Sequence, residues 1–495
     1  MAVAVFAPGL AQAQSPDRAD LAPALDAFVR KAMERTEAVP GLAIAVVDGQ
    51  GVVVTAGYGV ADVETGAPVT TDTRFYIASS TKSFTALSIA AMAARGEVDL
   101  DAPLSSWSSG SGTPQDALDT VSLTDLLSHR SGLDNRPMAF RLAYSGDWTP
   151  EVLWALTAET SYNSEAPRGT YAYANAGYNL ATVLIEHRWG RDWREMVEAE
   201  VLAPLGMTDT TAHIDSERAS GAVVAAGHFG FAPGRPEKSW LQKTDAAMQS
   251  AGGLVSTAGD MAIWLEAQIN DGVVGGRRVF PQGLVESTHA PRVLSDSTFG
   301  SYARTGYGLG WQTGRYGDDR LIHHFGNFGG SRAHVSFMPE RRLGVAVMVN
   351  EDGFAGDLAD LTANYVYDWF AGMPDLEAVY EVRLDELTAS RDRRRAAWAD
   401  GVESRSRRPR SLSLPNAAYV GEYVSPALGT MMVRPAGERL ELAIGLLHAV
   451  AENFTQPESL RAELSPLSGQ VVTFEVSDGR VVALTLAGER FIRHP

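Results

Sequence analysis

The sequence predicts an α/β (α+β) fold, in which one antiparallel sheet is flanked by helices and a helical region is inserted between its strands. Runs rich in β-branched residues occur at 41–56 and again at 321–349, with helix-like segments between them. Strands at both ends of a unit that enclose helices in the sequence are typical of one sheet completed by its terminal segments. After residue 416 the pattern changes to short strands and turns, which indicates a second, smaller β unit.

The elements of the first unit follow from periodicity and from the residues that start and stop them. Asp20 is placed to cap the first helix, and Pro23 lies in its first turn, where proline is tolerated. Asp48-Gly49-Gln50 separates two β-branched runs and is a hairpin signal. The predicted elements are a helix at 20–37, strands at 41–47 and 51–56, helices covering 84–93 and 180–186, strands at 321–324, 333–338 and 343–349, and a helix at 357–370.

The second unit follows a change of composition. Residues 375–400 are charged and helix-prone, and 404–410 form a basic, polar linker. Short strands come next, separated by turn residues such as Gly437 and Gly479. They are predicted at 419–423, 430–434, 439–444, 470–476, 480–486 and 491–493.

The segment Ser79-Ser80-Thr81-Lys82 carries the strongest chemical signal, because lysine is rare in this chain. Lys and Arg together number 42, but the only lysines are Lys31, Lys82, Lys238 and Lys243. A buried ammonium can lose its proton whereas a guanidinium cannot, so a base at this position has to be lysine. Serine three residues before lysine places both side chains on one helix face, which suits a serine nucleophile beside an amine base.

A Ser-x-x-Lys match is by itself a weak signal, since serine and threonine at a helix start also cap backbone N–H groups. The position of Lys82 strengthens it. The first turn of a helix is the positive end of the macrodipole, and both that dipole and burial lower the pKa of an ammonium. The position is therefore poor for a structural charge and good for a neutral general base.

Residues 75–84 resemble the active-site box of the serine β-lactamase and penicillin-binding-protein superfamily. The segment is most similar to the branch that holds class C β-lactamases, DD-peptidases, D-aminopeptidases and related esterases. A second box of that superfamily supplies a tyrosine and an asparagine, and the stretch 169–179 offers Tyr173 and Asn175. The alternative for this stretch is an aromatic loop before a helix, with Asn175 as the helix cap.

The third box of the superfamily is a strand-borne triplet, often His-x-Gly in its esterases and D-aminopeptidases. Two His-Phe-Gly triplets compete, at His228 and at His324. His228 lies in a loop-like stretch, whereas His324 and Gly326 precede two strand-like runs, as expected for a triplet on the edge strand of a sheet. We therefore assign the triplet to His324, the alternative being that His324 is only a packed strand residue. Weaker similarities occur in the order of the family at 126–133, 251–260 and 307–311.

The resemblance implies acyl transfer through a covalent serine ester. Ser79 would attack a carbonyl carbon, with Lys82 and Tyr173 sharing the proton in an order that the sequence leaves open. The backbone N–H groups of Ser79 and Asn327 would form the oxyanion hole, and Asn175 would hold Lys82 and contact the substrate amide. The resemblance implies no metal and no organic cofactor.

The strand pattern at the end of the chain resembles the small lipocalin-like β-barrel appended to some members of the same branch. The predicted divisions are a catalytic domain at 14–373, a charged helical linker at 374–411 and the barrel at 412–495. Three roles stay open for the barrel: a ligand-binding site, a wall of the active site, and a surface through which the chain forms homo-oligomers.

Composition excludes several classes of partner. Acidic residues outnumber basic ones, 60 against 42, and the formal charge of −18 argues against nucleic acid. No apolar stretch is long enough to predict a membrane-spanning helix. The absence of cysteine rules out disulfides and thiolate metal sites.

The N-terminal segment concerns localisation. Residues 1–13 read as a signal-peptide remnant ending in Ala11-Gln12-Ala13, which predicts a bacterial periplasmic or secreted protein. The alternative is a disordered alanine-rich tail.

These features predict a serine hydrolase that acts through a Ser79 acyl-enzyme on small amides, D-amino-acid peptides or esters. The alternatives are a β-lactamase or DD-carboxypeptidase, and, in another class, a slowly acylating penicillin-binding or scaffold protein. β-Lactamases carry lysine where this chain has His324. Because a largely neutral histidine holds a carboxylate less well, substrates without a carboxylate beside the scissile bond should be preferred.

Overall fold

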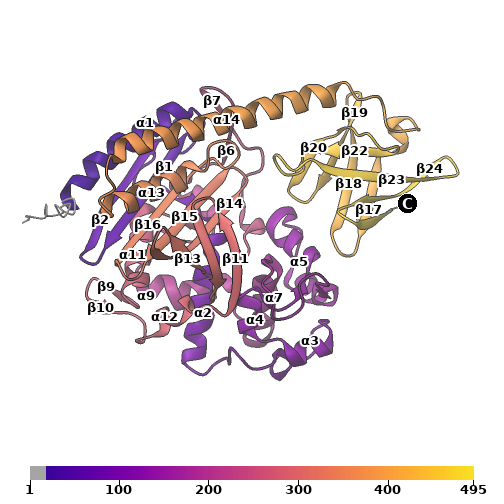
Figure 1. The fold of residues 1–495 in the computed structure, drawn as a ribbon. Coiled ribbons are helices and arrows are strands. Elements are labelled where there is room, and N and C mark those ends of the chain that lie inside the picture. The colour runs from indigo at the N-terminus through magenta and orange to yellow at the C-terminus, as the bar shows by residue number, and fades with distance from the viewer. Residues whose placement is uncertain (1–17, 495) are drawn as a thin grey trace, which may run out of the picture.

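The computed structural model of the chain describes residues 18–494 and contains two units. The first combines a large sheet with helices, and the second is a smaller sheet at the C-terminal end (Figure 1). One long helix, α14 (Leu376–Ser406), runs from the first unit to the second (Figure 1). The predicted signal segment at 1–13 lies outside the described residues.

An eight-stranded antiparallel sheet forms the frame of the first unit, in the order β11-β12-β13-β14-β15-β16-β1-β2. Ala45 in β1 lies opposite Ala346 in β16, so both ends of the unit meet in one sheet, as predicted, and β2 alone lies beyond them at that edge. The strands are β1 (Gly41–Asp48), β2 (Gly51–Gly59), β11 (Val293–Phe299), β12 (Tyr302–Tyr307), β13 (Gln312–Tyr316), β14 (Asp319–Phe328), β15 (Ser331–Met338) and β16 (Leu343–Val349).

The strand that carries His324 is not at the edge of the sheet, contrary to the prediction. Three strands, β11 to β13, continue the sheet beyond β14. Their segment, 293–316, is polar and rich in glycine, so it lacks the β-branched run that identified the other strands. The pairing of β13 with β14 nevertheless stops at His323. One side of residues 324–328 is therefore free of β13, and the 3-10 turn Ala78–Ser80 packs against this part of β14.

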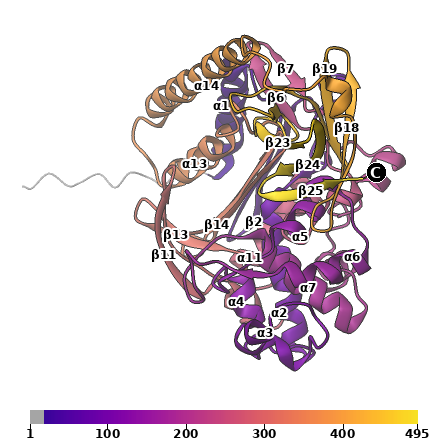
Figure 2. The same ribbon diagram turned by 90° about the vertical axis from the view of Figure 1, so that its right-hand side faces the viewer.

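The sheet is buried on both faces. Alternate residues of β1 separate the two cores: Leu42, Ile44 and Val46 pack with α1 and α13, whereas Ala43 and Ala45 pack with α2 and α11. Figure 2 shows α1, α13 and α14 on one side of the sheet and the inserted helices on the other. The second face holds the site, because α2 begins there.

The helices are more numerous than the sequence pattern predicted, since many are a single turn or two. The predicted helix 180–186 belongs to α7, which begins at Asn175, so Asn175 is the first helical residue and not the cap. The helices are α1 (Leu21–Thr36), α2 (Thr81–Ala94), α3 (Gln115–Thr120), α4 (Leu123–Leu127), α5 (Arg136–Phe140), α6 (Pro150–Ala155), α7 (Asn175–Trp189), α8 (Trp193–Val197), α9 (Ala203–Leu205), α10 (Ile214–Ser220), α11 (Ala258–Ile269), α12 (Leu284–His289), α13 (Leu358–Phe370) and α14.

Four short strand pairs connect these helices. His228, predicted in a loop, is the first residue of one of them. The pairs are β3 (Phe75–Tyr76) with β8 (Val255–Ser256), β4 (Leu133–Asp134) with β5 (Ser161–Tyr162), β6 (His228–Ala232) with β7 (Arg235–Lys238), and β9 (Val273–Val274) with β10 (Arg277–Arg278).

The C-terminal unit is a nine-stranded antiparallel sheet whose two end strands, β20 and β21, are separated by one residue, so the sheet nearly closes into a barrel. The prediction missed β20, β21 and β22, which are short. The strands are β17 (Gly421–Ser425), β18 (Gly429–Ala436), β19 (Arg439–Ile444), β20 (Leu447–Val450), β21 (Glu452–Asn453), β22 (Ser459–Ala462), β23 (Gln470–Ser477), β24 (Arg480–Leu486) and β25 (Glu489–Arg493).

The barrel is docked against the first unit by both polar and apolar contacts. The buried Arg141 guanidinium donates to the carbonyl oxygens of Pro426 and Ala427, at 2.9 and 2.7 Å. Phe140 and Tyr144 of the first unit pack against the barrel core. Among residues 18–494, no helix is long and apolar enough to cross a membrane.

Buried histidines make the stability of this fold sensitive to acid. Burial lowers the pKa of six of the ten histidines, to about 3 for His289. The six are His129, His228, His289, His323, His324 and His334. Below their unfolded pKa of about 6.5 the unfolded chain binds more protons than the native state, so protonation favours unfolding.

We therefore expect the free energy of unfolding to fall as the pH is lowered from about 7 to 5. Each histidine contributes at most about 1.4 kcal/mol per pH unit. Four carboxyl groups with raised pKa values oppose part of this effect: Glu186, Asp260, Glu351 and Asp352. Thermal unfolding followed by circular dichroism across this range tests the expectation. A Tm that stays level or rises toward pH 5 would contradict it.

Candidate active site

A strand, a strained turn and a helix present Ser79. The chain leaves β3, passes through Ala78 and enters α2 two residues after Ser79. Ala78 has a φ of 44°, a left-handed conformation that costs a non-glycine residue about 1 kcal/mol or more. The turn leaves Ser79 half-buried, whereas its neighbours Ala78 and Ser80 are fully buried. The backbone thus exposes one hydroxyl at the start of the helix.

Lys82 lies one turn further on and is completely buried. Its Nζ lies 3.3 Å from Ser79 Oγ and donates to Asn175 Oδ1 at 2.7 Å and to the Ala251 carbonyl oxygen at 2.6 Å. Burial lowers the pKa of this lysine well below its usual 10.5. A neutral amine has two N–H donors and one lone pair. The two acceptors can occupy both donors, which leaves the lone pair for Ser79.

Tyr173 faces the same pair of residues. Its ring is 4.8 Å from Lys82 Nζ, and its hydroxyl forms a hydrogen bond with Ser79. Tyr173 as a whole is 45% exposed, although its phenol lies against Lys82 and Ser79. Burial raises the pKa of this phenol, and the bond to Ser79 offsets only part of the increase. Tyr173 is therefore a protonated phenol at neutral pH.

Ser80, the neighbouring serine, has a different environment. Its hydroxyl is buried and donates to the His324 carbonyl oxygen at 2.9 Å. This bond ties the turn before α2 to β14. The structure thus brings Ser79, and not Ser80, together with Lys82 and Tyr173.

The His324 side chain is buried beside this group, and its ring centre lies 6.2 Å from that of Tyr173. Nδ1 is 2.9 Å from the Phe325 carbonyl oxygen, and Nε2 is 3.0 Å from the Tyr307 hydroxyl. Because a carbonyl oxygen only accepts, Nδ1 carries the proton and Nε2 accepts from Tyr307. Burial lowers the pKa of His324 well below 6.5. The imidazole is neutral and both nitrogens are engaged. His228 instead contacts Val63 and Asn350.

Gly326 brings β14 against the backbone of the turn before Ser79. A Cβ atom at this position would stand 2.1 Å from the Ile77 carbonyl oxygen and 2.9 Å from Ser79 N. Only glycine allows this approach. The next residue, Asn327, is exposed at the end of the same strand. Its strand is thus held beside the Ser79 N–H.

The loop 249–254 is a part of the site whose role the sequence did not identify. It supplies the Ala251 carbonyl to Lys82, and Thr81 Oγ1 fixes it by accepting from the N–H groups of Gly253 and Leu254, each at 3.1 Å. Tyr76 donates to the Gly252 carbonyl oxygen at 2.5 Å. The similarity noted at 251–260 was the available signal, but a backbone carbonyl has no residue type to read.

His129 positions the segment that carries Tyr173. It has a φ of 58°, its carbonyl accepts from Ala172 N–H at 2.8 Å, and its Nδ1 accepts from Ala174 N–H at 3.2 Å. Its ring centre lies 4.4 Å from that of Tyr173. The sequence similarity at 126–133 therefore corresponds to a support for the tyrosine segment.

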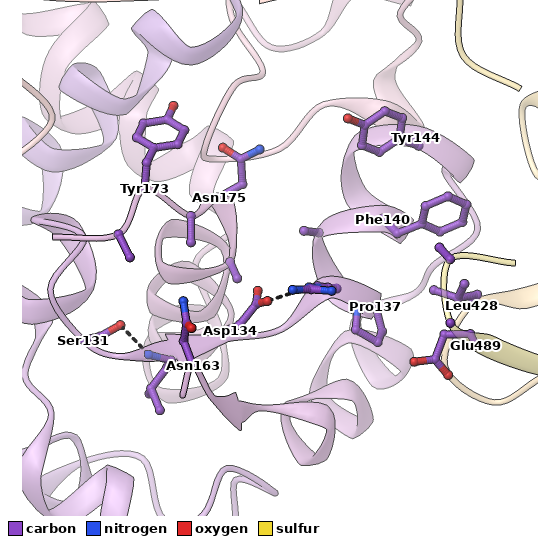
Figure 3. A pocket seen from close by; sticks show the side chains of 18 of the residues that line it. Ser131, Asp134, Pro137, Phe140, Tyr144, Asn163, Tyr173, Asn175, Leu428 and Glu489 are labelled. Carbon is purple, nitrogen blue, oxygen red and sulfur yellow. Dashed lines mark hydrogen bonds and ion pairs between the residues drawn. The ribbon is translucent and has the colours of Figure 1, made fainter. Parts of the chain in front are cut away.

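A pocket of about 730 Å³ opens beside Tyr173 and Asn175. We call it the polar pocket, because Asp134, Arg136 and Glu489 also line it. Figure 3 shows Tyr173 and Asn175 on one side of it and the barrel residues Leu428 and Glu489 on the other. The barrel thus forms part of the wall. Within residues 18–494, no cluster of three or more carboxylate or imidazole side chains is arranged to hold a metal ion.

Replacement of Gly326 by alanine tests whether catalysis depends on the close approach of β14 to the turn before Ser79. We expect Gly326→Ala to lower kcat/KM by about 100-fold or more, because the added methyl group displaces the Ser79 turn. We also expect a loss of about 1–3 kcal/mol of stability from overpacking. Activity on a p-nitrophenyl ester and thermal unfolding measure the two effects.

Gly259→Ala is the matched control, since the atom nearest to a Cβ there is Thr257 Oγ1 at 3.8 Å. It should leave activity unchanged. A Gly326→Ala protein with activity within threefold of the wild type would show that the contact is dispensable.

Comparison with known proteins places this site in a family. The unguisins hydrolase of Aspergillus campestris is 26% identical over 456 residues, which cover 87% of this chain and 80% of that protein. The D-aminopeptidase of Brucella anthropi is 26% identical, over 77% of this chain and 71% of its own. The octameric penicillin-binding protein homologue from Pyrococcus abyssi has the same fold, with a TM-score of 0.59 at 23% identity, covering 95% of this chain and 100% of that chain. The Beta-lactamase family model matches residues 25–366, and the chain therefore belongs to the β-lactamase family and is a serine hydrolase.

Proposed function

We propose that this serine hydrolase cleaves amides and short peptides of D-amino acids that carry a free amino group. The observation that carries the proposal is the buried Lys82, which lies 3.3 Å from Ser79 Oγ while Asn175 and Ala251 accept from its amine. This geometry supports an activated serine with no further group required to take the first proton.

The directions of the two pKa values support an order of proton transfer. Lys82, with a lowered pKa, is the neutral base that accepts the Ser79 proton as Oγ attacks the carbonyl carbon. Tyr173, with a raised pKa, keeps its proton and hydrogen-bonds to Ser79. It is placed to pass a proton to the leaving amine and to be reprotonated by Lys82. A water molecule then hydrolyses the Ser79 ester by the reverse transfers.

The oxyanion hole is proposed from the contact at Gly326. The strand approaches so closely that a Cβ would lie 2.9 Å from Ser79 N. The N–H groups of Ser79 and Asn327 would then point to the developing oxyanion from the turn and from the strand end. Asn175, held by Lys82, would accept or donate a hydrogen bond at the substrate amide.

Two features support substrates with an amino group and without a carboxylate beside the scissile bond. His324 is neutral and its nitrogens are engaged, so it offers no charge to a carboxylate. Glu489 lines the polar pocket and makes no ion pair within the described residues, so its carboxylate is available to an ammonium group. The preference for the D configuration is supported by the similarity to the Brucella anthropi D-aminopeptidase alone.

Two further proposals concern the context of the enzyme. Secretion or a periplasmic location is supported by the signal-like composition of residues 1–13. Self-association, for which we propose the C-terminal unit as the contact surface, is supported as such by the octameric state named for the Pyrococcus abyssi homologue.

The nucleophile is tested by covalent labelling. A fluorophosphonate probe should add once to the wild type, on the peptide that contains Ser79, and should fail to label Ser79→Ala. Ser80→Ala is the neighbouring control and should still be labelled, since the Ser80 hydroxyl donates to the strand and not to Lys82 or Tyr173. Intact mass spectrometry reads out each adduct. Labelling of Ser79→Ala would overturn the assignment.

The substrate class is tested by four specificity constants. We expect kcat/KM for D-alanine p-nitroanilide to exceed that for its N-acetyl derivative and for benzylpenicillin by at least about tenfold, since the acetyl group removes the ammonium and the penicillin adds a carboxylate. If benzylpenicillin is the best substrate, the enzyme is a β-lactamase. If a neutral p-nitrophenyl ester is best, it is a carboxylesterase.

A further inference from the structure

A second pocket lies beside the polar pocket, and the two share a wall made by Phe140 and Tyr144. Its volume is about 420 Å³. Asn327 and Phe328 at the end of β14 line it on one side, and the barrel lines it on the other. We call it the barrel-side pocket. The barrel contributes Leu447, Leu464, Ser465, Pro466, Ser468, Gln470, Leu486 and Ala487.

The two pockets differ in chemistry. The polar pocket contains Asp134, Arg136 and Glu489, whereas no charged residue lines the barrel-side pocket. The rim of the barrel-side pocket has polar groups, and some of them bond to each other, whereas the Ser465 hydroxyl has no partner among the described residues. The Ser468 hydroxyl donates to the Ser465 carbonyl, and Gln470 Oε1 accepts from Leu464 N–H at 3.1 Å. The surface offered to a ligand is therefore mainly apolar.

Lys243 lies close to the barrel-side pocket but does not add a charge to its lining. Lys243 Nζ lies 3.8 Å from the centre of the Phe328 ring, but it does not line the pocket. Its amine is buried and donates to the carbonyl oxygens of Ala143 and Ala247, at 2.6 and 3.0 Å. These bonds keep it behind Phe328 as part of the wall.

We infer that the barrel-side pocket binds an apolar side chain of the substrate residue next to the scissile bond. The inference rests on the proposed function, because Asn327 belongs both to this pocket and to the proposed oxyanion hole. A carbonyl held by the Asn327 N–H would have its neighbouring group at the mouth of the pocket. Leu447, Leu464 and Leu486 give that group an apolar surface, and the volume admits a phenyl or branched aliphatic side chain.

The barrel therefore acts as a specificity element. A β-strand unit that is remote in sequence supplies both the carboxylate of the polar pocket and the apolar wall of the barrel-side pocket. The substrate class that fits both is an amide of an apolar amino acid, whose amino group and side chain enter different pockets. Such a substrate gains from burial of its side chain, so it should be preferred over an alanine amide by about tenfold or more.

Trp substitution at the rim tests the inference. Ser468 is exposed at the rim of the barrel-side pocket, so Ser468→Trp narrows it without altering the barrel core. We expect the wild type to hydrolyse D-phenylalanine and D-leucine p-nitroanilides at least about tenfold better than the D-alanine derivative. In Ser468→Trp this preference should be lost, so that the ratio of kcat/KM for the two larger substrates to kcat/KM for the D-alanine derivative falls to about one.

Ser477→Trp is the matched control, because Ser477 is also exposed in a barrel hairpin but does not line the pocket. It should keep the preference. Pro466→Trp, at another position on the rim, repeats the test if Ser468→Trp does not fold. A wild type that is indifferent to the side chain, or a Ser468→Trp protein that loses all three substrates equally, overturns the inference.

A binding measurement separates this inference from the proposed function. Titration calorimetry on Ser79→Ala should show D-phenylalanine amide binding at least about tenfold more tightly than D-alanine amide. Equal affinities overturn the inference, whatever the wild type hydrolyses. Selective binding without hydrolysis of any amide by the wild type overturns the proposed function and supports the pocket.

Discussion

The burial of one ammonium group sets the requirements that the rest of the site meets. Lys82 has no solvent exposure, and a charged amine in such surroundings is costly unless it is paired. Among the described residues no carboxylate pairs with it, since its acceptors are an amide oxygen and a backbone carbonyl. These neutral partners accept hydrogen bonds from two N–H groups of Lys82, but they bring no negative charge that would stabilise its protonated form. The lysine is thereby held as a base directly beside the serine, and each element that supplies an acceptor has to be fixed in place.

Three segments that are distant in sequence surround Ser79 and Lys82. α7 brings Asn175, the loop 249–254 brings the Ala251 carbonyl, and β14 closes the site at Gly326. The loop is tied to β3 and α2 through Tyr76 and Thr81, and β14 is tied to the turn before α2 through Ser80. The bond from Lys82 to Asn175 ties α7 to α2. The large sheet makes this possible, because its strands from both ends of the unit form one rigid layer under α2 and α11. The barrel then adds pocket walls without touching Lys82.

The sequence predicted the parts of the fold that have a strong local signal. The long helices α1, α2 and α13 and the central strands β1, β15 and β16 have clear periodicity and appear within a few residues of their predicted bounds. β11 to β13 were missed because alternation there is interrupted by glycine and polar residues, and this error placed His324 at an edge. The short helices of the inserted region have no periodicity to detect, since one turn holds too few residues.

In the candidate site, too, some groups could be predicted from the sequence and others could not. Ser79 and Lys82 could be named from their residue types and their spacing on one helix face, whereas Tyr173, Asn175 and Gly326 were named from the resemblance of their segments to boxes of the superfamily. The Ala251 carbonyl, the left-handed Ala78 and the bond from Tyr307 to His324 could not be named. A backbone group has no identity in the sequence, and the partner of a buried ring depends on tertiary packing. The apolar wall built by the barrel likewise depends on how two units dock.

The protonation state of Lys82 is the central claim, and the scarcity of lysine makes it directly measurable. The chain contains four lysines, so labelling with ¹³Cε-lysine gives four signals in an NMR titration. The signal that disappears in Lys82→Arg identifies Lys82. We predict that this signal titrates well below pH 10.5, so that the amine is largely neutral at the pH of optimal activity. A Lys82 signal that titrates at or above its ordinary value would contradict the account.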